Sequence, residues 1–325
     1  MRKYLILLVL MGYIGTSNAQ NNTGLTSKPD TSYTTYSAFQ KTVKNNPDIR
    51  IVQDQPSEKV KETRNLVYCN IGIRQLHIDA FVPSKHLAKT PAILIIHGGG
   101  WRSGNHMQHI PLAQHLATAG YACFTVEYRL STEALYPAAV YDIKAALRWM
   151  RSNARKFNID TAKISVLGFS AGGELAAFVG ATANDRKYED ANCNIGYSSS
   201  VQAIVDIDGT LSFVHPESGE GDDSRSISAG TYWFGYAKKD NPALWLDASP
   251  LTHVNNNTAP ILFINSSVEK MHAGRDDFRK ALDEKKIYSE AHTFEKAPHS
   301  FCLFDPWFDP TVNYIVGFLD KVFRN

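Results

Sequence analysis

The fold of this 325-residue chain is decided by the stretch Lys163-Ile-Ser-Val-Leu-Gly-Phe-Ser-Ala-Gly-Gly-Glu-Leu-Ala-Ala-Phe-Val-Gly180. Its first part, Ile164 to Leu167, is a short apolar run rich in β-branched residues, which favours a buried parallel strand. Its last part, Glu174 to Val179, combines strong helix formers with apolar residues at helical spacing. The stretch therefore predicts a strand that passes through a sharp turn into a helix.

The turn has the sequence Gly168-Phe-Ser170-Ala-Gly172, which matches G-x-S-x-G. Glycine on both sides of the serine lets the strand and helix backbones approach closely, and it permits the strained φ/ψ that lifts a hydroxyl clear of a sheet. The start of the helix would direct free N–H groups at negative charge that forms near Ser170. Motif and context together predict that Ser170 is a nucleophile. The alternative interpretation is a glycine-rich turn around a buried serine.

Strands and helices alternate along the chain on both sides of this stretch. Two runs of alternating polarity, 59–69 and 74–82, predict an antiparallel hairpin. Further strands are predicted at 92–96, 121–128, 201–207, 261–264 and 288–294, and further helices at 110–119, 137–153, 275–285 and 311–323. This order predicts an α/β fold whose mostly parallel sheet is covered by helices on both faces. Residues 210–257 lack such periodicity, which predicts a cap-like insertion.

The N-terminal region differs in composition from the rest. Residues 1–19 have a charged start, an apolar run too short to span a bilayer and small residues at the end, so they are predicted to be a signal peptide. The polar residues 20–58 predict a flexible extension, which leaves 59–325 as the catalytic domain. We expect a secreted or periplasmic protein without membrane insertion. The formal net charge of +2 does not suggest a nucleic-acid partner.

A serine nucleophile requires a base, usually histidine, and an acid that orients the base. In sheets of this layout, serine, acid and histidine follow successive strands in that order. His299 stands just beyond the last predicted strand and is the predicted base. Glu269 follows the preceding strand and is the predicted acid, with Asp276 as the main alternative. Asp206 and Asp208 end the strand before that, and structural roles are preferred for both.

Backbone N–H groups are needed to stabilise the oxyanion of an acyl-transfer intermediate. The residue after the nucleophile, Ala171, supplies one such group. Gly99 and Gly100, in the glycine run after the strand 92–96, are predicted to supply the others, because side chains there would block the substrate carbonyl.

The chain has four cysteines, and export would permit disulfides among them. Cys123 lies in a strand pattern and is predicted to be a small buried apolar group. Cys193 and Cys302 both lie in predicted loops and are one candidate pair, while the sequence leaves the pairing of Cys69 open.

Several motifs in fixed order resemble the α/β-hydrolase esterases of the hormone-sensitive-lipase type: His97-Gly-Gly-Gly-Trp101, Tyr128-Arg-Leu130, Pro137-Ala-Ala, Asp142, Arg148-Trp149 and the serine turn. Ala248-Ser-Pro-Leu251 followed by Pro260-Ile-Leu is similar to the carbohydrate-esterase branch, which includes acetyl-xylan, feruloyl and pectin esterases. The resemblance covers roughly residues 60 to 323. It implies an α/β-hydrolase fold and ester hydrolysis through a covalent acyl-enzyme, with no cofactor. No spacing of cysteine and histidine residues in the sequence suggests a metal site.

These observations predict a secreted serine esterase that hydrolyses acetyl, methyl or feruloyl esters on plant cell-wall polysaccharides or oligosaccharides. The alternatives are a serine peptidase of the same fold and a non-catalytic carbohydrate-binding homologue. Trp101 is a candidate for stacking on sugar rings. His272 and Arg275, in the predicted acid loop, are candidates for binding an acidic sugar.

Overall fold

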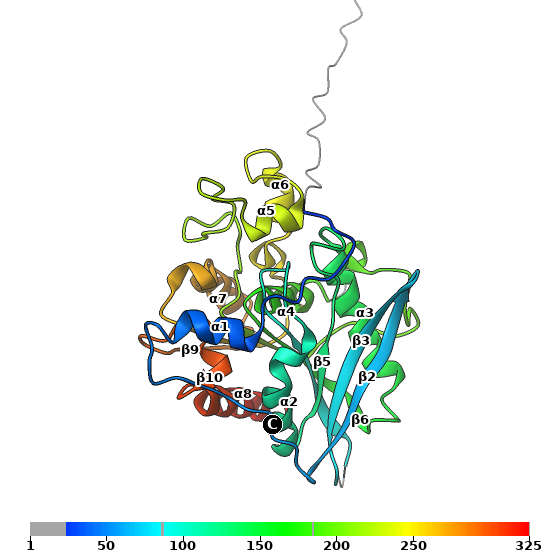
Figure 1. Ribbon diagram of the computed structural model, residues 1–325. Coiled ribbons are helices and arrows are strands. Elements are labelled where there is room, and N and C mark those ends of the chain that lie inside the picture. The colour runs from blue at the N-terminus through cyan, green and yellow to red at the C-terminus, as the bar shows by residue number, and fades with distance from the viewer. Residues whose placement is uncertain (1–23, 86–87, 184, 325) are drawn as a thin grey trace, which may run out of the picture.

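The centre of the computed structural model is an eight-stranded sheet with helices on both faces (Figure 1). The structure describes residues 24–85, 88–183 and 185–324, so the predicted signal peptide, residues 1–19, lies outside the described residues. The strands of this sheet are β2 (Val60–Ile71), β3 (Arg74–Pro83), β4 (Thr90–Ile96), β5 (Ala122–Val126), β6 (Ile159–Phe169), β7 (Ala203–Ile207), β8 (Ile261–Asn265) and β9 (Ser289–Thr293). A two-stranded sheet joins β1 (Arg50–Ile51) to β10 (Phe304–Asp305).

The large sheet has the order β2-β3-β5-β4-β6-β7-β8-β9. β3 pairs antiparallel with β2 and β5, whereas the pairs from β5 through β9 are parallel. This confirms the predicted α/β fold with an antiparallel N-terminal hairpin. The carboxyl ends of the parallel strands meet at one edge, which is where ligands bind in sheets of this kind.

Helices cover both faces of the sheet, as predicted. They are α1 (Thr35–Thr42), α2 (Ile110–Thr118), α3 (Ala138–Ser152), α4 (Ala171–Ala181), α5 (Ala229–Phe234), α6 (Pro242–Asp247), α7 (Arg275–Glu284) and α8 (Phe308–Arg324). Consecutive residues of β4 point to opposite faces of the sheet: Leu94 joins the core under α3 and α4, and Ile93 joins the core under α2 and α8. Within the three described ranges, none of the helices is long and apolar enough to cross a membrane.

Residues 24–58, predicted as a flexible extension, form ordered structure in the described part. They contain α1 and β1, and β1 pairs antiparallel with β10. Ala38 and Ile49 are buried in the core beside α2 and α8, and Phe39 packs edge-on against Phe304. A few apolar anchors therefore fix a segment whose polar composition indicates flexibility.

The insertion of residues 210–257 lies at the carboxyl edge of the sheet, where Figure 1 shows α5 and α6 above α4. Its aromatic side chains form a buried cluster. The tilted rings of Trp233 and Phe234 have a centroid distance of 5.0 Å, and the ring centroids of Phe234 and Trp245 lie 4.5 Å apart. This cluster packs on the core face that also contains Trp101, so the insertion is firmly attached to the domain.

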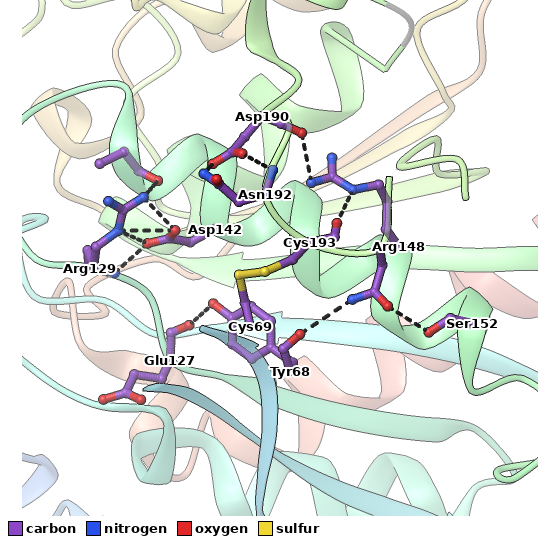
Figure 2. The surroundings of a disulfide bond; sticks show 12 residues. Tyr68, Cys69, Glu127, Arg129, Asp142, Arg148, Ser152, Asp190, Asn192 and Cys193 are labelled. Carbon is purple, nitrogen blue, oxygen red and sulfur yellow. Dashed lines mark hydrogen bonds and ion pairs between the residues drawn. A yellow bond between two sulfur atoms is a disulfide. The ribbon is translucent and has the colours of Figure 1, made fainter. Parts of the chain in front are cut away.

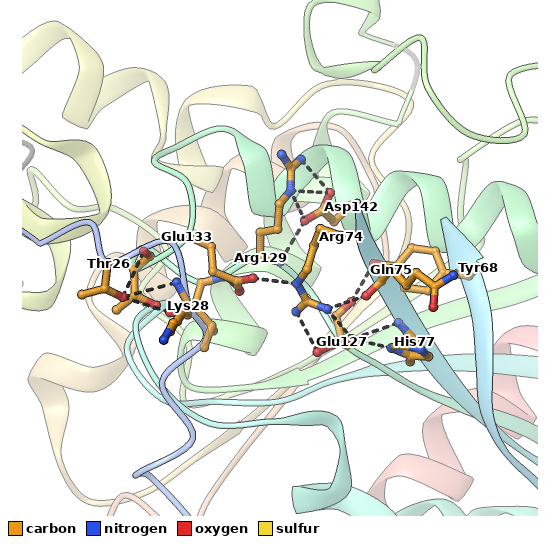
Figure 3. A network of polar contacts seen from close by, with 12 residues as sticks. Thr26, Lys28, Tyr68, Arg74, Gln75, His77, Glu127, Arg129, Glu133 and Asp142 are labelled. Carbon is orange, nitrogen blue, oxygen red and sulfur yellow. Dashed lines mark hydrogen bonds and ion pairs between the residues drawn. The ribbon is translucent and has the colours of Figure 1, made fainter. Parts of the chain in front are cut away.

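A network of ion pairs fixes the segment after β5 (Figure 3). Arg74 of β3 donates hydrogen bonds to Glu127 at 2.8 Å and to Glu133 at 2.7 Å. Arg129 binds the buried carboxylate of Asp142 in α3 with Nε at 2.9 Å and Nη2 at 2.8 Å. Bidentate pairing of this kind sets geometry as well as energy. The ion pairs therefore fix the positions of the hairpin and of α3 relative to the segment after β5.

A disulfide joins Cys69 of β2 to Cys193 in the loop before β7 (Figure 2). Arg148 of α3 donates to the carbonyl oxygen of Cys193 at 2.9 Å and fixes the same loop. The candidate pair Cys193–Cys302 is wrong, because Cys302 is a buried free thiol in the core on the other face of the sheet. Cys123 is buried and free, as predicted.

Removal of this disulfide is expected to lower the free energy of unfolding by about 2–5 kcal/mol, because the bond closes a long loop and restricts the unfolded chain. The cysteines it joins are 124 residues apart. Chemical denaturation of the double variant Cys69→Ser/Cys193→Ser measures the effect. As a control, reductant should destabilise the wild type to about the same level and leave the double variant unchanged. Equal stability of variant and wild type would contradict the prediction.

Candidate active site

Ser170 lies at the junction of β6 and α4 in a strained backbone conformation. Its φ of 57° and ψ of −120° place a non-glycine residue outside the usual regions. A Cβ atom at Gly168 would lie 1.9 Å from the carbonyl oxygen of Gly172, and one at Gly172 would lie 2.3 Å from that of Ile96. Only glycine fits these positions, which is the physical reason for the G-x-S-x-G pattern.

The structure brings Ser170, His299 and Asp208 together in one hydrogen-bonded chain. His299 Nε2 lies 2.8 Å from Ser170 Oγ, and His299 Nδ1 lies 2.9 Å from Asp208 Oδ2. The second oxygen of Asp208 accepts the Ser266 N–H at 2.8 Å. Asp208 is buried, whereas Ser170 and His299 are partly exposed. This is the geometry of a nucleophile, its base and the acid that orients the base.

The prediction that Glu269 orients the histidine is wrong, because Asp208 occupies that place. Glu269 is exposed in the 3-10 turn η4 (Glu269–His272). The alternative, Asp276, is exposed in the first turn of α7 and accepts a hydrogen bond from Arg275. At the end of β8, the position after which the acid was expected, the buried residue is Asn265.

Asp208 is the functional residue that the sequence reasoning missed. The Ser170 N–H donates to the carbonyl oxygen of Ile207 at 2.8 Å, so the end of β7 is fixed directly beside the nucleophile. Asp208 follows at once with a φ of 53°, which turns the chain immediately after the strand. The available signal was an aspartate in the first position after the strand that neighbours the serine strand.

Asp206, two residues earlier, points into the protein from the same strand. Its Oδ1 accepts the Gly209 N–H at 2.8 Å. Burial, with the nearby charge of Asp208, raises the pKa of Asp206 well above its usual value. The raised pKa favours the neutral form of Asp206. Asp206 contacts the backbone of the turn after β7, whereas Asp208 contacts the imidazole.

The residues predicted for the oxyanion hole, Gly99, Gly100 and Ala171, line the same pocket as Ser170 and His299. Gly99 has a φ of 129°, and a Cβ atom there would lie 1.8 Å from the Ser103 carbonyl oxygen. The preceding Gly98 N–H is engaged with Gln108 Oε1 at 2.9 Å. This arrangement agrees with the assignment of the hole to Gly99, Gly100 and Ala171, whose backbone N–H groups are the proposed donors.

Two buried side chains connect residues 97–104, here called the glycine loop, to α4, the helix that follows Ser170. Trp101 Nε1 donates to Glu174 Oε2 at 2.8 Å, and the Trp101 ring stacks on Trp233 with a centroid distance of 4.8 Å. Burial raises the pKa of Glu174 well above its usual value, which favours the neutral form of the carboxyl group. Trp101 is only 3% exposed, with one face covered by Trp233, and its main contacts are with the protein.

Replacement of Trp101 by phenylalanine is expected to lower kcat about tenfold with little change in KM for 4-nitrophenyl acetate. The change removes the donor to Glu174, leaves a buried acceptor unpaired and loosens the loop that carries the proposed oxyanion donors. Glu174→Gln is the matched control, because an amide oxygen still accepts the indole N–H, and it should stay within about twofold of wild type. Equal kcat for Trp101→Phe and wild type would contradict this positioning role.

The pocket at Ser170 has a volume of about 440 Å³ and is lined by residues from several elements. His272 and Arg275, predicted as substrate-binding candidates, do not contribute to this lining. His272 is buried, and Arg275 donates to Asn265 at 3.0 Å and to Asp276 at 2.9 Å. Neither side chain lines the pocket, so the prediction that His272 and Arg275 bind the substrate is wrong.

The strand order, the strained serine turn and the Ser170–His299–Asp208 contact define the α/β-hydrolase class. The residues 78–272, more than half of the chain, match the BD-FAE family. The chain therefore belongs to the BD-FAE family of α/β-hydrolase esterases.

Curated relatives of this chain are esterases by name. The chain is 30% identical to Esterase LipC of Mycobacterium tuberculosis over 251 residues, which cover 72% of this chain and 59% of the relative. It is 33% identical to the Arylesterase of Saccharolobus solfataricus over 133 residues, 41% of this chain and 43% of the relative. The chain thus spans about half the length of the curated relatives it matches.

A truncated carbohydrate esterase from gut microbiota has the same fold, with a TM-score of 0.70. Its sequence identity is 24%, and the match covers 82% of this chain and 99% of that one. An acetyl ester-xyloside bifunctional hydrolase from Caldicellulosiruptor lactoaceticus matches with a TM-score of 0.65 at 22% identity, over 77% of this chain and 89% of that one. These likenesses establish the fold.

Proposed function

We propose that the protein is an exported serine esterase that hydrolyses carboxylic esters on plant cell-wall polysaccharides or their oligosaccharides. The observation that carries this proposal is the hydrogen-bonded chain from Ser170 through His299 to Asp208, which opens into the pocket beside the glycine loop. Membership of the BD-FAE family supports ester hydrolysis as the reaction. The esterase names of the matched relatives favour an ester over a peptide substrate.

In the proposed mechanism, His299 Nε2 takes the proton of the Ser170 hydroxyl as Ser170 Oγ attacks the ester carbonyl carbon. Asp208 accepts a hydrogen bond from His299 Nδ1–H and stabilises the imidazolium that forms. The N–H groups of Gly99, Gly100 and Ala171 stabilise the oxyanion. His299 then protonates the leaving alcohol oxygen, which leaves an acyl group on Ser170. Water, deprotonated by His299, releases the acid in a second passage through the same steps.

Three observations support the substrate class: the structural neighbours, the size of the pocket and the residues that line it. The structural neighbours named above include a carbohydrate esterase and an acetyl ester-xyloside hydrolase. The pocket volume of about 440 Å³ is within the range of small-molecule sites. Hydroxyl groups of Ser32, Ser37 and Thr210 line it and are of the type that hydrogen-bond to sugars.

Incubation with acetylated xylan, acetylated pectin, methyl-esterified pectin and feruloylated arabinoxylan tests the substrate class. Release of acetate, methanol or ferulate by the wild type, and not by the Ser170→Ala variant, would support the proposal. Turnover of 4-nitrophenyl acetate without release from any polysaccharide or its oligosaccharides would restrict the protein to other esters. Cleavage of dipeptide anilides without ester cleavage would favour the peptidase alternative.

Export is part of the proposal. The apolar leader in residues 1–19 has the composition of a signal peptide. The Cys69–Cys193 disulfide supports the same interpretation, since such bonds persist in oxidising compartments. Mass spectrometry of protein recovered from outside the cytoplasm should find Gln20 as the first residue and the disulfide intact.

A further inference from the structure

The N-terminal segment of residues 24–46 forms one wall of the active-site pocket. Five of its side chains line the pocket together with Ser170 and His299: Asp30, Ser32, Tyr33, Ser37 and Lys41. The other walls come from the glycine loop, the insertion of residues 210–257 and η4. A substrate seated on Ser170 therefore contacts a segment that precedes the catalytic domain in the sequence.

The segment of residues 24–46 is anchored at two places, one on the glycine loop and one beside His299. The Tyr33 N–H donates to Ser103 Oγ at 2.8 Å, and the Gly104 N–H donates to the Asp30 carbonyl oxygen at 3.0 Å. These contacts attach the segment to the glycine loop.

At its other end, Thr42 Oγ1 lies 3.3 Å from Ser300 Oγ, next to His299 in the chain. Helix α1 begins with a reciprocal capping box between Thr34 and Ser37, which fixes its first turn. Lys41, in the last turn of α1, is thus held at the pocket between two anchored points.

The charged groups of the pocket are engaged with one exception. Besides the phenol of Tyr33, the lining contains six ionisable side chains: Asp30, Lys41, Arg102, Asp208, Glu220 and His299. Asp208 and His299 bind each other. The Arg102 guanidinium lies 4.0 Å from the centre of the Tyr232 ring. The ion pairs and hydrogen bonds among the described residues include none with the Lys41 ammonium group.

The two remaining carboxyl groups are held by other partners. Burial acts to raise the pKa of Asp30, but hydrogen bonds from Ser32 and Ser103 and the charge of Arg102 outweigh it and keep that pKa below its usual value. Glu220 accepts the Gly230 N–H at 2.9 Å, and burial raises its pKa. Arg102 has no ion pair among the described residues either, but its guanidinium is engaged with the Tyr232 ring and the Gly24 carbonyl oxygen. Lys41 is consequently the cation of this lining that makes no ion pair, hydrogen bond or ring contact through its side chain among the described residues.

We propose that Lys41 binds a carboxylate of the substrate, so that the enzyme prefers esters that carry a negative charge. This inference rests on the proposed function and names the substrate class of the same site. The carboxylate has two possible sources, a uronic acid in the sugar or a dicarboxylic acyl group, and both present the same chemistry to an ammonium group.

Two pairs of substrates distinguish these sources. In the sugar pair, an acetylated methyl uronoside is compared with the acetylated neutral glycoside in which the carboxyl group is reduced to an alcohol. In the acyl pair, 4-nitrophenyl hydrogen glutarate is compared with 4-nitrophenyl valerate, which has the same chain length. Turnover of 4-nitrophenyl acetate measures basal activity, so loss of the proposed esterase function would be recognised separately.

The Lys41→Gln variant is expected to lose about fivefold in kcat/KM on the charged member of one pair, with little change on its neutral member or on 4-nitrophenyl acetate. An exposed ion pair is worth about this factor, and 0.5 M salt should abolish the wild-type preference. Lys41→Arg should retain most of the preference. Lys44→Gln is the matched control, because Lys44 is exposed on the same segment but lies outside the pocket lining.

Three results would overturn the proposal: no wild-type preference for the charged member of either pair, a preference that Lys41→Gln leaves intact, or an equal loss in Lys44→Gln. If Lys41 serves only the C-terminal end of α1, its replacement will lower the melting temperature and leave the preference unchanged, which also contradicts the proposal.

Discussion

The Ser170→Ala variant is expected to lose about 10⁴- to 10⁶-fold in kcat on 4-nitrophenyl acetate while it keeps the stability of the wild type. Removal of a nucleophile leaves only the rate enhancement that comes from binding and oxyanion stabilisation. The change deletes one oxygen whose hydrogen-bond partner in the protein is His299 Nε2. The backbone N–H of residue 170, which donates to the Ile207 carbonyl oxygen, is unaffected.

A fluorophosphonate probe gives a second measurement that does not depend on the choice of substrate. It should label the wild type at Ser170, as peptide mass spectrometry would show, and leave Ser170→Ala unlabelled. Ser165→Ala is a suitable control, because Ser165 is a buried serine of β6 that donates to the Ala92 carbonyl oxygen, away from the catalytic residues. Comparable turnover by Ser170→Ala and wild type would exclude the proposed mechanism.

The parts of the site that could be predicted depend on local pattern. The turn at Ser170 was predictable because its glycines are required by backbone contacts with Gly172 and Ile96, which any sequence with this turn must satisfy. His299 was predictable because the order of the strands places the last loop beside the serine turn. In both cases, the residue type and its position after a strand were sufficient.

The acid could not be assigned in the same way, because a carboxyl side chain follows each of two successive strands, Asp208 after β7 and Glu269 after β8. Glu269 has the usual position in the chain order, but η4 directs it to the solvent. The structure uses Asp208 instead, one strand closer to Ser170 in the sheet. The end of β7 lies beside the nucleophile because the Ser170 N–H donates to the Ile207 carbonyl oxygen. This is a tertiary contact, which the order of residues along the chain does not reveal.

The N-terminal wall was missed for a similar reason. The segment of residues 24–46 is polar, and its apolar contacts are widely spaced, so its sequence shows no period. Its order comes from single contacts with distant parts of the chain, such as Phe39 with Phe304 and Tyr33 with Ser103. Composition gives only the average polarity of a segment, whereas a few contacts with the rest of the protein can hold a polar segment in one place.

The Asp208→Asn variant is expected to lower kcat about 10³- to 10⁴-fold, far more than Glu269→Gln, which should stay within about twofold of wild type. The Ser266 N–H would hold the amide oxygen of the new asparagine in place of Asp208 Oδ1. The amide NH₂ would then face His299 Nδ1 and require that nitrogen to be an acceptor. The imidazole would carry its proton on Nε2, where it could not take the proton of Ser170.

Asp206→Asn is the matched control for this prediction, because Asp206 lies in β7 two residues before Asp208, is buried and has a pKa that burial raises well above its usual value. An amide oxygen can still accept the Gly209 N–H there, so kcat should change by less than about threefold. Single-turnover acylation kinetics for the three variants, with melting temperatures to verify folding, make the comparison. A large loss in Glu269→Gln, together with near-normal rates in Asp208→Asn, would return the orienting role to Glu269 and exclude the assignment to Asp208.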